Sequence, residues 1–307
     1  MIRYIIQRLL LALPVLLGVS FGVFLMVQFV PGDPATVLAG DAASPQMIAA
    51  LRQELGLDQP IPVQYLRFLE RLVLHGSLGN STRTHREVLV EIADRFPYTL
   101  LLTLSAVIVS TVVGVLMGIF AAINHGRAGD FVTMMLAVIG LSVPSFWIAL
   151  LMIMLFALNL HWLPVTGAAS WQNLIMPTVT LSLHSASVKA RVARASMLEV
   201  MGQEYVRTAR AKGLREKTVI VGHALKNALI PIVTLIGLQF GGLLGGAFIT
   251  ETIFGWPGVG RLAVQSIFNR DFPVIQGTVL LVAVAYMASN LIVDIIYGWL
   301  DQRIRYN

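Results

Sequence analysis

Residues 98–123 read YTLLLTLSAVIVSTVVGVLMGIFAAI, an apolar run without a charged side chain. This run is long enough for a helix to cross the hydrocarbon core of a bilayer, which takes about 20 residues. The rest of the chain has a similar character, since 56% of its 307 residues are hydrophobic and only 12% are charged. A soluble domain carries about 25% charged residues. The composition therefore excludes a soluble enzyme and a nucleic-acid-binding module, and predicts an all-α integral membrane protein.

Five further segments have the length or composition of a membrane span: 5–30, 131–158, 174–188, 228–249 and 274–299. A signal peptide has an apolar core of about 7–15 residues, so we expect residues 1–30 to remain as the first transmembrane helix. In the segment 131–158, the sequence Ser142-Val143-Pro144-Ser145 predicts a kink. The segment 174–188 is the weakest, because it is rich in Thr and Ser. Together with 98–123, these segments predict six transmembrane helices.

The longest polar stretch, residues 31–97, separates the first two spans. Ser44-Pro45 predicts the start of a helix, with proline in its first turn, and Gly56 predicts its end. A second amphipathic helix is expected over 63–74. We therefore expect residues 31–97 to form a small helical subdomain, and residues 98–307 to form a core with five transmembrane helices.

Basic residues indicate how the chain is oriented in the membrane. Six spans place both ends on one side, and 14 of the 22 Lys and Arg residues then lie on that side, with 8 on the other. Basic residues concentrate on the cytoplasmic side of membrane proteins. Both termini and the loop 189–227 are therefore predicted to be cytoplasmic, and residues 31–97 extracytoplasmic.

The predicted cytoplasmic loop contains EYVRTARAKG at residues 204–213. Its alanines would let a short helix come close to another protein, and Gly213 can take the left-handed conformation that ends a helix. The positive charges alone would also follow from the preference of basic loops for the cytoplasm, but that preference does not explain the alanine and glycine pattern. We interpret the helix as a contact for a soluble partner, made by Glu204, Tyr205, Arg207, Thr208, Ala209, Ala211, Lys212 and Gly213.

This stretch, continued to Pro231, resembles the cytoplasmic EAA loop of ATP-binding-cassette (ABC) importer permeases, especially the dipeptide, oligopeptide and nickel branch. Further motifs of that branch occur in order: PGDP (31–34), GLDQP (56–60), LP (163–164), RASM (194–197), WPGVGR (256–261), RDFPV (270–274) and RIR (303–305). The general pattern has Glu-Ala-Ala where this chain has Arg207, Thr208 and Ala209. It has proline where this chain has Lys226, whereas the peptide and nickel branch shows the longer form found here.

The resemblance implies the architecture of a type I ABC importer permease in the bacterial cytoplasmic (inner) membrane. It also implies three kinds of partner: a paralogous permease, two ATP-binding cassette ATPases that contact the segment 204–231, and an extracytoplasmic solute-binding protein. The chain contains no Gly-x-x-x-x-Gly-Lys-[Ser/Thr] phosphate loop. We therefore expect a non-catalytic subunit without a cofactor of its own, surrounded by membrane lipid, with ATP and Mg²⁺ bound by its partners.

Several residues are candidates for a translocation path or gate: Ser142, Pro144, Glu251, Thr252 and Asp294. Asp294 lies inside an apolar span, where a carboxylate is costly and usually functional, although it is close enough to the helix end to reach the interface. Glu251 is equally compatible with an ordinary acid at a helix end. His184 could line a path or be a structural histidine. The histidines show no ligand-like spacing, so no metal site is expected.

The sequence leaves the substrate open. Branch membership favours short peptides, with nickel or other metal chelates and glutathione as alternatives. A secondary transporter would need several ionisable groups inside its spans and repeated halves, and Asp294 alone is weak support for one. An intramembrane metalloprotease finds no support, since His-Glu-x-x-His does not occur.

Overall fold

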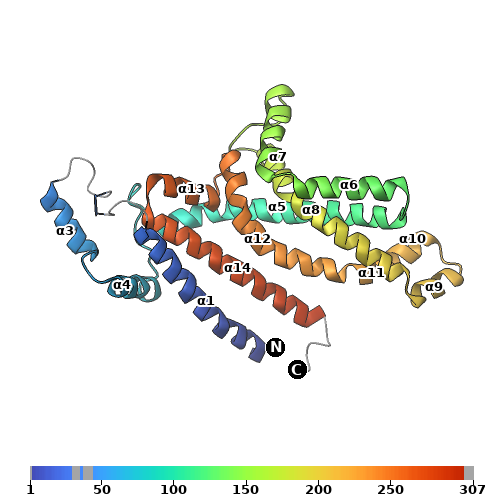
Figure 1. Ribbon diagram of the computed structural model, residues 1–307, viewed down its shortest axis with the longest axis horizontal. Coiled ribbons are helices and arrows are strands. Elements are labelled where there is room, and N and C mark those ends of the chain that lie inside the picture. The colour runs from blue at the N-terminus through green and yellow to red at the C-terminus, as the bar shows by residue number, and fades with distance from the viewer. Residues whose placement is uncertain (1, 30–34, 37–43, 301–307) are drawn as a thin grey trace. The chain divides into compact units, whose positions relative to one another are not determined.

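The computed structural model describes residues 2–29, 35–36 and 44–300, and in these residues it contains helices and no strands (Figure 1). The all-α prediction is therefore confirmed. The motifs at 31–34 and 303–305 lie outside the described residues.

The described chain forms two compact units. Unit 1 comprises Thr99–Trp256 and the residues from Ala288 onward, and unit 2 comprises Ile2–Tyr98 and Pro257–Met287. Residues 257–287 thus group with the N-terminal part of the chain, whereas the sequence analysis assigned them to the core 98–307.

In its described residues, unit 2 contains a long N-terminal helix, three shorter helices and parts of two other long ones. These are α1 (Ile2–Phe29), α3 (Pro45–Leu55), α4 (Ile61–Leu74), the beginning of α5 (Val88–Ile123), α13 (Val259–Asn269) and the first part of α14 (Phe272–Leu300). The predicted caps of α3 are confirmed. Ser44 Oγ accepts a hydrogen bond from the Met47 N–H at 3.3 Å, and Gly56 ends the helix with φ +67°.

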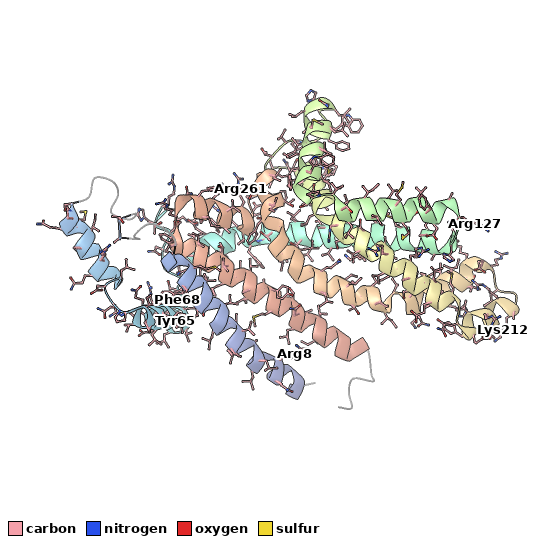
Figure 2. The ribbon with its side chains drawn as sticks, in the orientation of Figure 1. Arg8, Tyr65, Phe68, Arg127, Lys212 and Arg261 are labelled. Carbon is pink, nitrogen blue, oxygen red and sulfur yellow. The ribbon has the colours of Figure 1, made fainter. Side chains whose placement is uncertain are left out.

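Aromatic contacts hold α4 against α1. The ring of Tyr65 lies 5.0 Å from that of Phe21 and 5.5 Å from that of Phe24, and Phe68 lies 6.1 Å from Phe24. Figure 2 shows Tyr65 and Phe68 on α4. Phe21 and Tyr65 form an edge-to-face pair, an arrangement that contributes about 0.5–1.5 kcal/mol beyond the buried area.

A second set of contacts explains why residues 257–287 belong to unit 2. Val88 and Ile92 of α5 pack with Leu262 of α13 and Val274 of α14 in one buried cluster. Asp271 accepts hydrogen bonds from the Ser81 hydroxyl at 2.5 Å and the Thr82 N–H at 3.1 Å. Residues far apart in the sequence are thus joined by both apolar and polar contacts.

Unit 1 contains the helices around the predicted partner contact. Besides the rest of α5 and α14, these are α6 (Ala128–Ser142), α7 (Ser145–Met152), the π-helical η1 (Ile153–Asn159), α8 (Gln172–Met201), α9 (Glu204–Ala211), α10 (Glu216–Thr218), the π-helical η2 (Val219–Ala224), α11 (Leu225–Ala228) and α12 (Ile230–Ile253). In Figure 1, α6 runs alongside α5 and α8.

Two glycines allow α5 and α8 to approach closely. A Cβ added at Gly114 would lie 2.6 Å from the Ala186 carbonyl oxygen, and one added at Gly118 would lie 2.4 Å from the Ala193 Cβ. Side chains do not fit at such distances, so the backbone of α8 occupies the space that the glycines leave. Small residues four positions apart are typical of such close helix contacts.

Helix α8 is longer than its apolar run. The sequence predicted a span over 174–188 followed by a loop over 189–227, but the helix continues to Met201. The first residues of the predicted cytoplasmic segment are therefore helical, and its position relative to the membrane stays a prediction. Small side chains such as Ala190 and Ala193, both fully buried, let the polar part of the helix pack instead of ending.

The predicted kink is a sharp break. Helix α6 ends at Ser142, α7 begins at Ser145, and the two axes differ by 101°. Pro144 is the N-cap of α7, with backbone angles outside the helical region (φ −61°, ψ 136°). A proline at this position starts the next helix in a new direction.

Length and composition support several membrane spans. Val88–Ile123 and Phe272–Val293 are each long and apolar enough to cross a bilayer, and two bent pairs would each be one more span. These pairs are Ala128–Ser142 with Ser145–Asn159, and Glu216–Ala228 with Ile230–Gly245. A shorter apolar helix covers Leu10–Met26. The count of six spans stays a prediction.

We expect Gly118→Val to lower the free energy of unfolding by about 1–3 kcal/mol, because the new side chain would overlap α8. Gly18→Ala is a suitable control, since no atom lies within 4 Å of the added Cβ. Thermal unfolding of the purified proteins in detergent measures the stability of the two variants. Equal melting temperatures for the two variants would contradict the close contact.

Candidate functional site

Helix α9 has one face buried and the other exposed. Val206 and Ala209, three residues apart, pack with Val219 of η2 and with Val200 of α8. This spacing places both side chains on the same face of a helix. The hydrophobic contact fixes α9 to the rest of unit 1 and directs its polar residues outward.

Polar contacts hold both ends of the coupling segment, by which we mean α9 with the following residues to Gly213. Asn227 Nδ2 donates a hydrogen bond to the Tyr205 hydroxyl at 2.7 Å, which joins α9 to α11. Arg210 makes two hydrogen bonds to the Glu216 carboxylate, at 2.8 and 3.2 Å. Gly213 has φ +76°, in the left-handed conformation predicted for the end of the helix.

A small hydrophobic core lies directly behind the coupling segment. Ala122 at the end of α5, Met197 near the end of α8, and Ile220, Ala224 and Ala228 of η2 and α11 pack together. Val200 packs against this core and also against Val206 and Ala209, so packed side chains connect α9 with the ends of α5 and α8. Figure 2 shows Lys212 beside α9, at the same end of unit 1 as Arg127.

The structure exposes all but one of the residues predicted to contact a partner. Ala209 is the exception: it is 5% exposed and lies beneath the helix, so it supports α9 and is not part of the contact surface. The sequence suggested otherwise because a small residue fits a close contact on either side of a helix. The exposed residues are Glu204, Tyr205, Arg207, Thr208, Ala211, Lys212 and Gly213.

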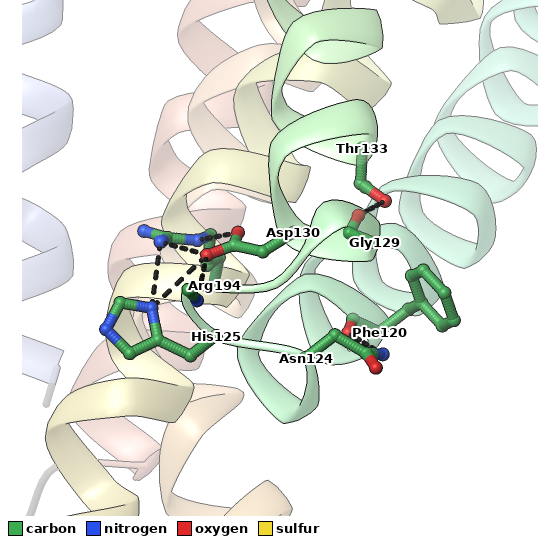
Figure 3. Close-up of polar contacts among 8 residues, drawn as sticks. Phe120, Asn124, His125, Gly129, Asp130, Thr133 and Arg194 are labelled. Atoms are coloured by element: carbon green, nitrogen blue, oxygen red, sulfur yellow. Dashed lines mark hydrogen bonds and ion pairs between the residues drawn. The ribbon is translucent and has the colours of Figure 1, made fainter.

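Figure 3 shows a polar cluster that joins the turn before α6 to α8. The Asp130 carboxylate accepts hydrogen bonds from Arg194 Nε at 2.6 Å and Nη2 at 2.7 Å. The Gly126 N–H also donates to this carboxylate, and His125 Nδ1 lies 3.2 Å from it. The sequence analysis missed the pairing of Asp130 with Arg194, which are 64 positions apart. The one sign of it in the sequence was the position of Arg194 in the RASM motif.

Lys189 is a second residue whose place the sequence did not reveal. The sequence analysis placed it in the loop 189–227. In the structure it lies on α8, and it is 0% exposed. Its ammonium donates hydrogen bonds to Ser110 Oγ at 2.7 Å and Ser185 Oγ at 3.1 Å, and Ser185 donates to Gln239 Oε1 at 2.5 Å. These bonds connect α5, α8 and α12 around a buried amine.

The break between α6 and α7 forms one wall of a pocket of about 210 Å³, and α8 forms the other. Ser142 and Pro144, two of the predicted path residues, line it together with His184 and Thr180. The structure thus places His184, from the predicted span 174–188, next to the break between α6 and α7.

The remaining predicted path residues lie elsewhere. Glu251 is 0% exposed and accepts a hydrogen bond from Thr99 Oγ1 at 2.6 Å. Its side chain is thus buried within this chain, and a role in a path or gate stays a prediction. Thr252 is exposed, and its hydroxyl donates to the Phe248 carbonyl oxygen at 2.7 Å. The side chain of Asp294 lies outside the described residues. Within the described chain, no group of three or more His, Asp and Glu side chains could hold a metal ion.

Family models cover nearly the entire chain. The model for the binding-protein-dependent transport system inner membrane component matches residues 114–306, and that for the N-terminal part of such membrane components matches residues 1–103. This chain belongs to the binding-protein-dependent permease family. The resemblance to ABC importer permeases is thereby confirmed, and the permease is a multi-pass protein of the inner membrane.

Relatives and solved structures agree with this assignment. The permease is 47% identical over 306 residues to the glutathione transport system permease protein GsiC of Salmonella paratyphi A and of Salmonella typhimurium, and 45% identical to that of Escherichia coli K12. Each alignment covers 100% of both chains.

Two solved structures share its fold. The inward facing MetNI methionine ABC transporter has a TM-score of 0.53 at 18% identity, covering 68% of the permease and 97% of that chain. An amino acid ABC transporter in complex with histidines has a TM-score of 0.50 at 21% identity, covering 70% and 94%.

Replacing Arg194 tests the contribution of the polar cluster. Because the Asp130 side chain is only 8% exposed, Arg194→Gln would leave its carboxylate without its main partner. We expect the free energy of unfolding to fall by about 2–3 kcal/mol. Arg86→Gln is the matched control, since Arg86 and Asp94 form an ion pair with side chains 53% and 56% exposed, where losses stay below about 1 kcal/mol. Similar melting temperatures for both variants would contradict a stabilising role of the cluster.

Proposed function

We propose that this chain is the permease subunit of an importer for glutathione or closely related short peptides. Its similarity to the glutathione permeases of Salmonella and Escherichia coli, 45–47% identity over the whole length, supports the proposal. Glutathione is itself a short peptide, so the proposal refines the peptide substrate favoured by the sequence.

The permease acts with a paralogous permease, two ATPase subunits and an extracytoplasmic solute-binding protein. The ATPases bind the exposed face of the coupling segment, where Lys212 offers positive charge and Gly213 ends the helix. Arg207 lies on the same face and forms an exposed ion pair with Glu204 at 2.8 Å. The lack of a phosphate loop supports placing ATP and Mg²⁺ on these partners, with no cofactor and no catalysis on this chain. The excess of basic residues supports cytoplasmic termini.

Transport follows from movement of the coupling segment. When ATP closes the ATPase dimer, α9 is displaced, and its contacts with Val200 of α8 and Val219 of η2 carry the displacement inward. Packed side chains transmit such motion because protein interiors resist compression. The membrane helices then open outward to receive substrate from the binding protein, and open inward after hydrolysis.

Reversing charge on the exposed face of α9 should release the ATPases. We expect the double variant Arg207→Glu and Lys212→Glu to reduce co-purification of the ATPases at least about tenfold, while the paralogous permease remains bound. Affinity purification in mild detergent with quantitative mass spectrometry measures both. Arg71→Glu with Arg83→Glu, the same change of charge at exposed positions in unit 2, is the control. ATPase recovery equal to that of the control would argue against coupling through α9.

Uptake by the complete transporter identifies the substrate. In proteoliposomes with the binding protein and ATP, we expect saturable uptake of labelled glutathione that excess unlabelled glutathione abolishes. Uptake of a labelled dipeptide or nickel chelate should be much slower at the same concentration. Faster transport of either compound, unaffected by glutathione, would refute glutathione as the substrate.

A further inference from the structure

The pocket at the break between α6 and α7 differs from an ordinary packing defect in its polar lining. Four of its residues carry hydrogen-bonding side chains: Ser142, Ser145, Thr180 and His184. The larger pocket of about 370 Å³ in unit 2 is lined by aliphatic residues, and its single hydroxyl, that of Ser20, is hydrogen-bonded to Leu17 and Tyr65. Of these two pockets, only the one at the break offers polar groups to a ligand.

Hydrogen bonds within the protein use two of the four side chains. The Ser142 hydroxyl donates to the Val138 carbonyl oxygen at 2.9 Å, and the Thr180 hydroxyl to the Met152 sulfur at 3.6 Å. Ser145 and His184 make no side-chain hydrogen bond to any described residue. Each therefore has a donor available to whatever enters the pocket.

The chemistry of the lining favours an acceptor. Within the described chain the pocket has one ionisable side chain, His184, and no acidic one. A carboxylate here would meet an imidazole N–H and a hydroxyl without repulsion from a like charge. Hydrogen bonds to a charged group are stronger than those between neutral groups. His184 is exposed and Ser145 half-buried in the described chain, so both are accessible to a ligand.

The size of the pocket limits what it can hold. Sites that enclose a drug-sized molecule have volumes of about 300–1,000 Å³. A space of about 210 Å³ is smaller, and suits one end of a peptide better than the entire molecule. The rest of the substrate would extend beyond the break.

We propose that this pocket is a substrate subsite, in which His184 and Ser145 donate hydrogen bonds to a carboxylate of the peptide in transit. The proposal rests on the proposed function, since it concerns the cargo of the same permease. It assigns to α8 a direct role in substrate passage and to the break in α6–α7 the role of making room for one charged end.

The test compares transport with ATP hydrolysis in the complete transporter. Because the pocket acts after the binding protein has released its cargo, His184→Leu should reduce glutathione uptake about tenfold or more, while ATP hydrolysis stimulated by loaded binding protein stays within about twofold of wild type. His184→Gln, which retains a donor, should recover much of the uptake. Ser145→Ala should reduce uptake in the same way as His184→Leu but less strongly. His75→Leu, at an exposed position in unit 2, is the control.

The outcomes separate this proposal from the one on which it rests. If wild type takes up no glutathione but transports a dipeptide, the glutathione assignment fails, and the same variants are then measured with the dipeptide. If wild type transports its substrate and both His184→Leu and Ser145→Ala match it, the subsite proposal is overturned. A parallel loss of uptake and stimulated ATP hydrolysis in both variants, or no recovery in His184→Gln, would indicate a structural role and overturn it as well.

Discussion

The close contact between α5 and α8 is the constraint on which unit 1 depends. Gly114 and Gly118 remove side chains where the backbone of α8 passes, so the two helices approach more closely than larger residues would allow. This contact lets α8 remain helical beyond its apolar run and bury Lys189 next to α5. The extended helix in turn places Arg194 beside Asp130 and Val200 beneath α9.

Helix α8 therefore connects two places that the sequence presents as separate. Near its middle, His184 faces the pocket at the break between α6 and α7, and at its end Val200 contacts α9. A helix resists compression along its axis because each turn is hydrogen-bonded to the next. In the mechanism proposed above, one continuous element would carry a displacement of α9 toward the pocket, which would link ATP hydrolysis to substrate passage.

The sequence predicted features governed by local chemistry. Gly56 and Gly213 end their helices as expected, and Pro144 marks a break, because each depends on the backbone preferences of one residue. The sequence did not predict features that depend on contacts between residues far apart in the chain. Basic residues such as Lys189 suggested a solvated loop, and the inward position of Ala209 depends on Val219, which another element supplies. Neither contact leaves a periodic signal in a single sequence.

The buried Lys189 has a consequence for how the protein is made. Within the described chain, α8 is not among the helices whose length and composition would let them cross a bilayer, and it carries Lys189, Arg191 and Arg194. Helix α8 is thus a poor candidate for entering the bilayer unaided. Since α5 is synthesised first, its Ser110, Gly114 and Gly118 are available when α8 emerges. Substitutions at these three positions would therefore reduce the amount of folded permease before they affect transport by the assembled complex.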